Sequence, residues 1–181
     1  AQVKRLARPK MGLARNYWDE MGRGNMGGMH GPMLDMTVAG LELTPTIEST
    51  LWQSLALANT MTAFATTRRY AFHSVGALGV VELTAPTRVA SVAAGLKRLG
   101  LAPKLRKYFD LHAVLDVEHS KAWNAEALVP LAETMPEVLP ATAEGALMRL
   151  LCGQQCMEAC RAMLWAEAGV RQPAPLLRQA G

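Results

Sequence analysis

Residues 108–123 have the sequence YFDLHAVLDVEHSKAW, which carries His112, Asp116 and His119 at offsets of four and seven residues. On an α-helix these offsets lie about 40° and about 20° from the first position, so the three side chains share one face. A face with two imidazoles and one carboxylate is costly to bury unless it binds something, and a divalent metal ion is the usual partner. The segment therefore predicts a helix that carries metal ligands.

Chance is a poor explanation for this pattern. With four His and 15 acidic residues among 181, a match to H-x3-[DE]-x2-H is expected only about 0.007 times. The remaining alternative is a pair of histidines that are hydrogen-bonded to Asp116 without a metal. In both cases the neighbouring acidic residues Asp110 and Glu118 are expected to point away from this face.

The rest of the chain also favours helices. Half of its residues are hydrophobic and only 6% are aromatic, a composition that suits helices better than a β-sandwich. A first helix is expected to end at Gly22, another to begin at Thr44, and a break between two helices to fall at 84–86. We predict an all-α fold, with one helical domain over residues 1–170 and a Pro-rich tail over 171–181.

The distribution of charge argues against a nucleic-acid-binding surface. Five cations precede Asp19, the first acidic residue, and without them the net charge of +4 becomes −1. A second basic stretch, residues 88–107, contains six cations and no acidic residue. This stretch is expected to be either a solvated helix face or a docking surface for an acidic electron-donor protein.

No segment indicates a membrane protein or a secreted one. The first residues are basic and lack the apolar core of a signal peptide. The uncharged run 49–67 has too many Ser and Thr residues for a lipid environment, so a buried helix is expected there. Cys152, Cys156 and Cys160 lie one helical turn apart, a spacing that makes poor disulfides and fits a reducing compartment. We therefore predict a cytoplasmic protein.

Two further candidate ligands flank a glycine-rich loop. Glu20 closes the first predicted helix, and His30 follows ten residues later. The glycines between them permit a tight reversal that returns His30 to Glu20. Asp19 would face about 100° away from Glu20, so only one of the two is expected to point inward. The G-x-G-x-x-G in this loop does not indicate dinucleotide binding, because no strand precedes it.

Glu82 is the sixth candidate ligand. It lies between Val81 and Leu83 and follows twelve residues without a formal charge. A lone carboxylate in such a segment is either buried and paired or exposed at a helix break. With it, the candidates are three carboxylates and three imidazoles, a set that suits two iron or manganese ions better than one structural zinc.

The order of these residues resembles the heme-oxygenase-like diiron oxidases and oxygenases, a family also described as iron-containing redox enzymes. The resemblance covers about residues 17–123: a Glu with a His ten residues later, an isolated Glu, and H-x3-D-x2-H. It implies a helical bundle like that of heme oxygenase, two non-heme iron ions, and O2-dependent oxidation of a small organic acid or an amino-acid-derived substrate. It also implies six metal ligands, Glu20, His30, Glu82, His112, Asp116 and His119, of which the three carboxylates are catalytic and Glu82 bridges the ions.

Three further expectations accompany this resemblance. Relatives generally have helical sequence before the first Glu ligand, but only 19 residues precede Glu20. An N-terminal truncation, or a second copy in a homodimer that completes the pocket, is therefore expected. Arg68, Arg69 and His73 are candidates for anchoring the small-molecule substrate, and an exposed helix end is their alternative role. The rival function is a non-catalytic metal-binding helical protein on the same fold.

Overall fold

The computed structural model describes residues 7–169, and this part of the chain is helical. Its α-helices are α1 (Ala7–Glu20), α2 (His30–Gly40), α3 (Trp52–Thr66), α4 (Ala71–Arg98), α5 (Lys107–Ala122), α6 (Val129–Thr134) and α7 (Leu139–Glu167). Residues 7–169 contain no strand, and the predicted all-α fold is confirmed. None of these helices combines the length and apolarity needed to cross a bilayer. The predicted tail over 171–181 lies outside the described residues.

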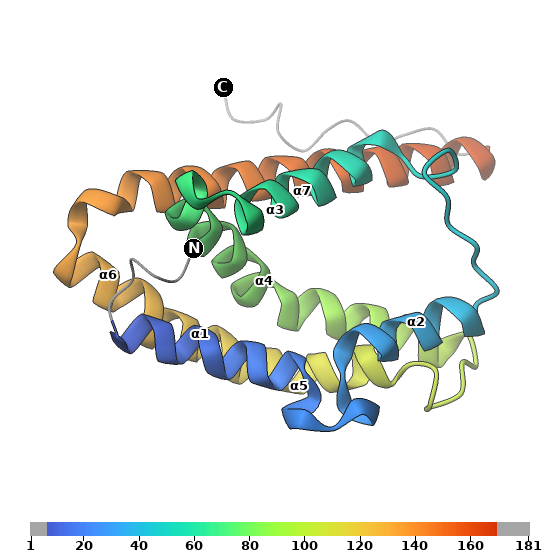
Figure 1. Ribbon diagram of the computed structural model, residues 1–181. Coiled ribbons are helices and arrows are strands. Elements are labelled where there is room, and N and C mark those ends of the chain that lie inside the picture. Colours follow the sequence, from blue (N-terminus) through green and yellow to red (C-terminus); the bar gives the residue numbers. More distant parts are fainter. Residues whose placement is uncertain (1–6, 170–181) are drawn as a thin grey trace.

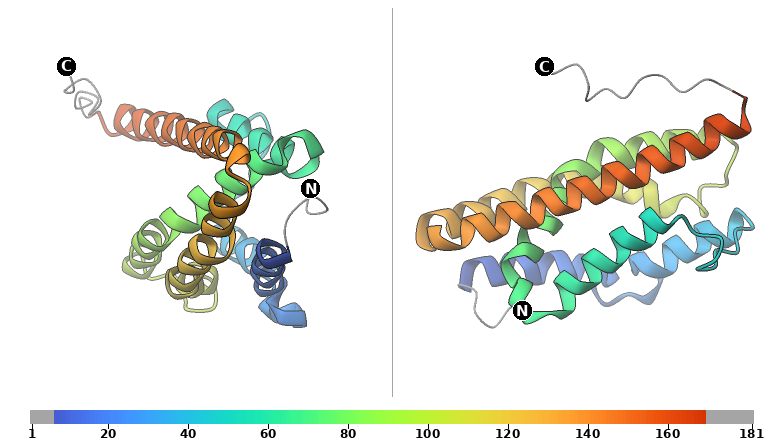
Figure 2. Two further views of the ribbon diagram at one scale, coloured as in Figure 1. Left: turned by 90° about the vertical axis from the view of Figure 1, so that its left-hand side faces the viewer. Right: turned by 90° about the horizontal axis from the view of Figure 1, so that it is seen from above.

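Helix α4 is the centre of the arrangement. It packs against both α5 and α7. Figure 1 shows α3 and α7 along one side of the molecule and α1, α2 and α5 along the other. Figure 2 shows these two groups of helices diverging from α4. The candidate metal ligands come from α1, α2, α4 and α5, so the side of the molecule that contains α1, α2 and α5 holds the candidate site.

A buried apolar cluster joins the helices next to the candidate site. It consists of Leu13, Val75, Trp123, Leu131 and Val138. These residues come from α1, α4, a π-helical segment (Trp123–Leu128), α6 and the turn before α7. The cluster therefore fixes α1 and the end of α5 against α4, and these elements supply most of the candidate ligands.

The crossing of α4 and α7 depends on two glycines. A Cβ atom on Gly76 would clash with the carbonyl oxygen of Thr142, and one on Gly145 would clash with the backbone of His73. Because both backbones occupy the space of a side chain, only glycine fits at these two positions. This contact fixes α4 near its start, and Glu82, the candidate ligand on α4, lies six residues after Gly76.

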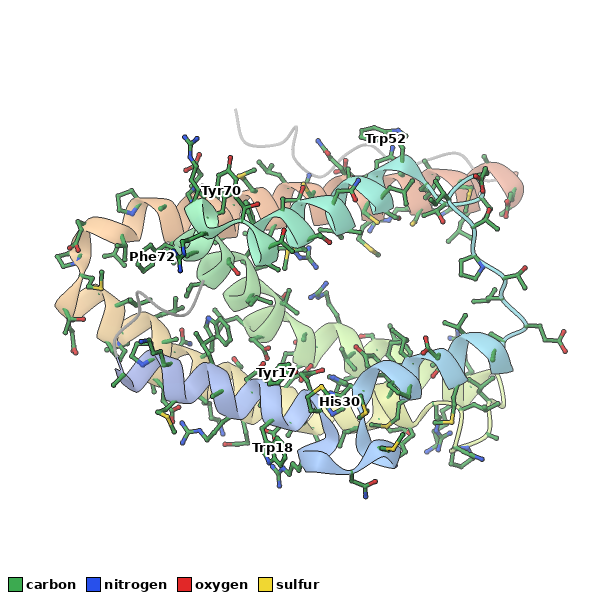
Figure 3. The ribbon with its side chains drawn as sticks, viewed as in Figure 1. Tyr17, Trp18, His30, Trp52, Tyr70 and Phe72 are labelled. Atoms are coloured by element: carbon green, nitrogen blue, oxygen red, sulfur yellow. The ribbon has the colours of Figure 1, made fainter. Side chains whose placement is uncertain are left out.

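The predicted helix start at Thr44 is wrong, because α3 begins at Trp52. In the turn before it, the hydroxyl of Ser49 accepts from the backbone N–H of Thr46 (3.0 Å). The hydroxyl of Thr46 accepts from the backbone N–H of Ser49 (3.1 Å). Such side-chain hydrogen bonds compete with helix formation. Helix α3 is also not the buried helix that we expected: only Phe64 is buried, and Trp52 is 66% exposed and points outward (Figure 3).

The predicted break at 84–86 is also wrong, because α4 continues through Pro86. Proline has no N–H, so the carbonyl of Glu82, four residues earlier, loses its helical partner at a cost of about 3 kcal/mol. The packing of α4 against α5 and α7 compensates for this local cost. Glu82 therefore lies inside a continuous helix and not at an exposed break.

Candidate metal centre

The loop between α1 and α2 brings Glu20 and His30 together. The three residues from Gly22 to Gly24 all have positive φ, the left-handed region that glycine adopts most easily. His30 is the first residue of α2, and its Nδ1 lies 2.9 Å from Oε2 of Glu20. Figure 3 shows His30 where α1, α2 and α5 meet. The predicted reversal at the glycines is confirmed.

The face of α5 also has the predicted orientation. His112, Asp116 and His119 are buried, with exposed fractions of 6%, 4% and 7%. The other acidic residues of this helix point elsewhere: Asp110 pairs with Arg106 (2.8 Å), and Glu118 pairs with Lys121 (2.8 Å). The three residues therefore project from α5 toward α1 and α4.

The six candidate ligands form two groups of three. Within each group, one ligand atom of each residue lies within 4.8 Å of the others. The first ligand group is Glu20, His30 and His112, and the second ligand group is Glu82, Asp116 and His119. The structure thus divides the two histidines of α5 between the groups and places Glu82 with Asp116. The bridging role of Glu82 stays a prediction.

The distances within the groups leave room for an ion. Nε2 of His112 lies 3.7 Å from Oε1 of Glu20. Nδ1 of His119 lies 3.6 Å from Oε2 of Glu82 and 3.7 Å from Oδ1 of Asp116. These separations are too long for hydrogen bonds. They are close to the separation of two atoms that each bind one ion at about 2.1 Å.

Two buried imidazole nitrogens test whether these residues fit a metal. Nδ1 of His30 and Nδ1 of His119 are buried and make no well-aligned hydrogen bond within the described part of the chain, although Oε2 of Glu20 lies 2.9 Å from Nδ1 of His30. Buried polar atoms are normally satisfied, so each of these two lone pairs is free to bind a ligand. Carboxylate oxygens of the same group face each nitrogen: Oε2 of Glu20 for His30, and Oε2 of Glu82 and Oδ1 of Asp116 for His119. A mixed set of imidazole and carboxylate donors suits iron or manganese, and the residues fit such ions.

In His112 and His119, the ring nitrogen that faces away from the ligand group makes a hydrogen bond to the protein. The carbonyl oxygen of Tyr108 accepts a hydrogen bond from Nδ1 of His112 (2.7 Å). Oδ2 of Asp19 accepts one from Nε2 of His119 (3.1 Å). These bonds select the tautomers that turn Nε2 of His112 and Nδ1 of His119 toward the ligand groups. Metal-bound histidines commonly have such support.

Sequence reasoning missed Asp19 and Asn16. Only one of Asp19 and Glu20 was expected to point inward, but Glu20 joins the first ligand group while Asp19 supports His119 from behind. Asn16 Nδ2 donates to Oε1 of Glu82 (3.0 Å). A signal for Asn16 was present in the sequence, since it lies one turn before Glu20 on the same helix face.

The charges of the two groups shift the pKa values of their members. The Glu82 carboxylate, assisted by Asp19, raises the pKa of His119 to about 9. Burial raises the pKa of Asp116 and lowers the pKa of His30. Burial opposes ionisation of Glu20, but the nearby imidazoles outweigh it and lower the pKa of Glu20. A proton on His119 therefore competes with a metal ion for Nδ1.

A cavity of about 500 Å³ lies beside both ligand groups. This volume suits a small organic molecule. Members of both groups form one part of its wall, and mostly apolar side chains of α4 and α5 form the rest, with Arg88 as the only cation. Its lining includes Glu20, Glu82, His112, Asp116, Val81, Arg88, Val89 and Phe109.

The candidate substrate anchors lie outside this cavity. Arg68 and Arg69 are exposed between α3 and α4. Nε2 of His73 lies 3.0 Å from Oε2 of Glu144 on α7. The structure does not bring these three residues to the ligand groups, and their role in substrate binding stays a prediction. Arg88, which sequence reasoning placed only in a basic stretch, lines the cavity instead.

One comparison with known proteins gives a match. A family model described as iron-containing redox enzyme matches residues 1–154, a range that includes both ligand groups. No curated protein and no solved structure gives a significant match. The family match and the two ligand groups support a heme-oxygenase-like helical bundle with bound iron and a redox activity. The chain belongs to the iron-containing redox enzyme family.

Proposed function

We propose that this protein is a non-heme diiron oxidoreductase that uses O2 to oxidise a small organic acid or an amino-acid-derived molecule. The proposal is based on the position of two three-residue ligand groups beside one cavity. Three protein ligands for each ion leave coordination positions for O2 or substrate. Manganese is the alternative metal for the same ligands.

The iron ions, when bound, supply the redox chemistry that couples O2 reduction to substrate oxidation. The protein provides charge and orientation. Glu20, Glu82 and Asp116 are the proposed catalytic carboxylates, because they offset the positive charge of the ions and line the cavity. Tyr108 and Asp19 hold the two histidines of α5 in the tautomers described above.

The walls of the cavity limit the access of water to the ligand groups. Its apolar side chains from α4 and α5 exclude water from part of the site, which strengthens electrostatic interactions there. Glu82 lines this cavity together with Glu20 and His112 of the other ligand group, and it stays the proposed ligand shared by the two ions. Oε1 of Glu82 accepts a hydrogen bond from Nδ2 of Asn16, and this bond helps to orient the carboxylate.

Anaerobic iron loading followed by exposure to O2 tests the proposal. Metal analysis should give about two iron ions per chain. Addition of O2 to the ferrous protein should produce a new absorption band, and a substrate should be oxidised in proportion to O2 consumed. Iron that binds but gives no optical change and no O2 consumption would support the rival function, a non-catalytic metal-binding protein.

A further inference from the structure

Arg88 is the only cation among the residues that line the cavity beside the ligand groups. Val81, Ala85, Arg88 and Val92 follow one another along α4 at intervals of four, three and four residues. These intervals place the four residues on one face of the helix. The other members of this row are apolar. Arg88 is therefore the one polar residue in an apolar row of α4, and it is exposed to solvent.

This guanidinium has no carboxylate partner among residues 7–169, where the ion pairs of arginine involve other residues. Nε of Arg88 donates to the carbonyl oxygen of Thr84 (3.2 Å). This bond holds the side chain along α4 and leaves the two terminal nitrogens of the guanidinium for a ligand.

The charge of Arg88 also acts on a second arginine, Arg149. Burial lowers the pKa of Arg149 on α7, and the charge of Arg88 lowers it further. Arg149 also has no carboxylate partner within residues 7–169. Arg149 does not line the cavity, so its charge adds to the positive potential around Arg88 without forming part of the cavity wall.

The charge of the cavity depends on the metals. Without ions, the three carboxylates Glu20, Glu82 and Asp116 outnumber the two cations, Arg88 and the protonated His119, so the site disfavours an anion. Two divalent ions bring four positive charges and reverse the sign of the cavity. Anion binding at Arg88 should therefore require the loaded metal centre.

We propose that Arg88 binds the anionic group of the substrate, and that the cavity takes a small monocarboxylate whose apolar part packs against side chains such as Val81, Val89 and Phe109. The planar guanidinium matches a carboxylate through two parallel hydrogen bonds. The inference rests on the proposed function, because it requires both ions in place. Under this inference, Arg88 of α4 recognises the carboxylate of the substrate. Arg68, Arg69 and His73 do not line the same cavity.

A matched pair of probes tests this assignment. The manganese-loaded protein is titrated calorimetrically with 3-phenylpropanoate and with its uncharged amide, so that the probes share one carbon skeleton and differ in the charge and hydrogen-bonding groups of the head. The wild type should bind the carboxylate at least about tenfold more tightly than the amide, as expected for a charged hydrogen bond. Arg88→Gln should abolish this preference. Arg88→Lys should keep part of it, since lysine provides charge without the fork geometry.

Arg98→Gln is the control, because Arg98 is an exposed residue of the same helix that does not line the cavity. It should keep the full preference, and metal analysis should find equal manganese in all variants. An unchanged preference in Arg88→Gln, or a wild type that binds both probes equally at full manganese content, would overturn this inference alone. Failure of the wild type to take up metal would contradict the proposed function together with this inference.

Discussion

The two ligand groups differ in charge, burial and support. The first has one carboxylate and two imidazoles, and the second has two carboxylates and one imidazole. The side chain of Glu20 in the first group is 40% exposed, whereas Glu82, Asp116 and His119 are between 5% and 12% exposed. The first group also depends on the loop between α1 and α2, while the second comes entirely from α4 and α5.

This difference predicts unequal metal affinities. Two carboxylates attract a divalent cation more strongly than one, and the attraction increases as water is excluded. Ligands on long helices also keep their geometry better than ligands joined by a loop. The second ligand group should therefore hold its ion more tightly, and the first should exchange its ion more readily with solvent.

Removing one histidine from each group should have the largest effect. His119→Ala should weaken the tight site more than the 10–100-fold effect of losing a supporting residue. His30→Ala should weaken only the more exchangeable site. Iron titrations in competition with a chelator measure both affinities. His73→Ala makes the same change outside the ligand groups and should leave both intact. Loss of the tight ion in His30→Ala, with its retention in His119→Ala, would reverse the ranking.

Asp19→Asn should have a smaller effect that is confined to the second ligand group. The amide is a weaker acceptor for Nε2–H of His119 and carries no charge, so affinity at this group should fall by about 10–100-fold. The pKa of His119 should fall as well, which NMR of the metal-free variant can measure. Asp110→Asn is the matched control, because Asp110 pairs with Arg106 on the outside of α5. Equal effects of the two variants would remove Asp19 from the site.

Metal affinity should also depend gradually on pH, with a change of at most about tenfold for each pH unit. In the metal-free protein the pKa of His119 is raised to about 9, so below that pH a metal must displace a proton from Nδ1. Affinity at the second ligand group should rise by about tenfold per pH unit between pH 7 and 8.5 and level off above 9. Calorimetry in buffers of different ionisation enthalpy should detect the released proton. A pH-independent affinity would contradict the raised pKa.

Local sequence patterns predicted the parts of the site that lie within one element. The spacing of His112, Asp116 and His119 placed them on one face, because helical periodicity is a local property. The glycines after Glu20 predicted its approach to His30, because a tight reversal requires left-handed backbone. Boundaries were predicted less well where packing or side-chain hydrogen bonds outweigh propensity, as at Pro86 and Thr44.

The sequence by itself determined the all-α fold, the candidate ligands and the family resemblance, since these depend on composition, periodicity and order along the chain. Only the tertiary structure assigned Asp19 to His119, divided the imidazoles between two groups and placed Arg88 at the cavity. Each of these facts joins residues from different helices. Their relative positions depend on how α1, α4 and α5 pack, which no local pattern specifies.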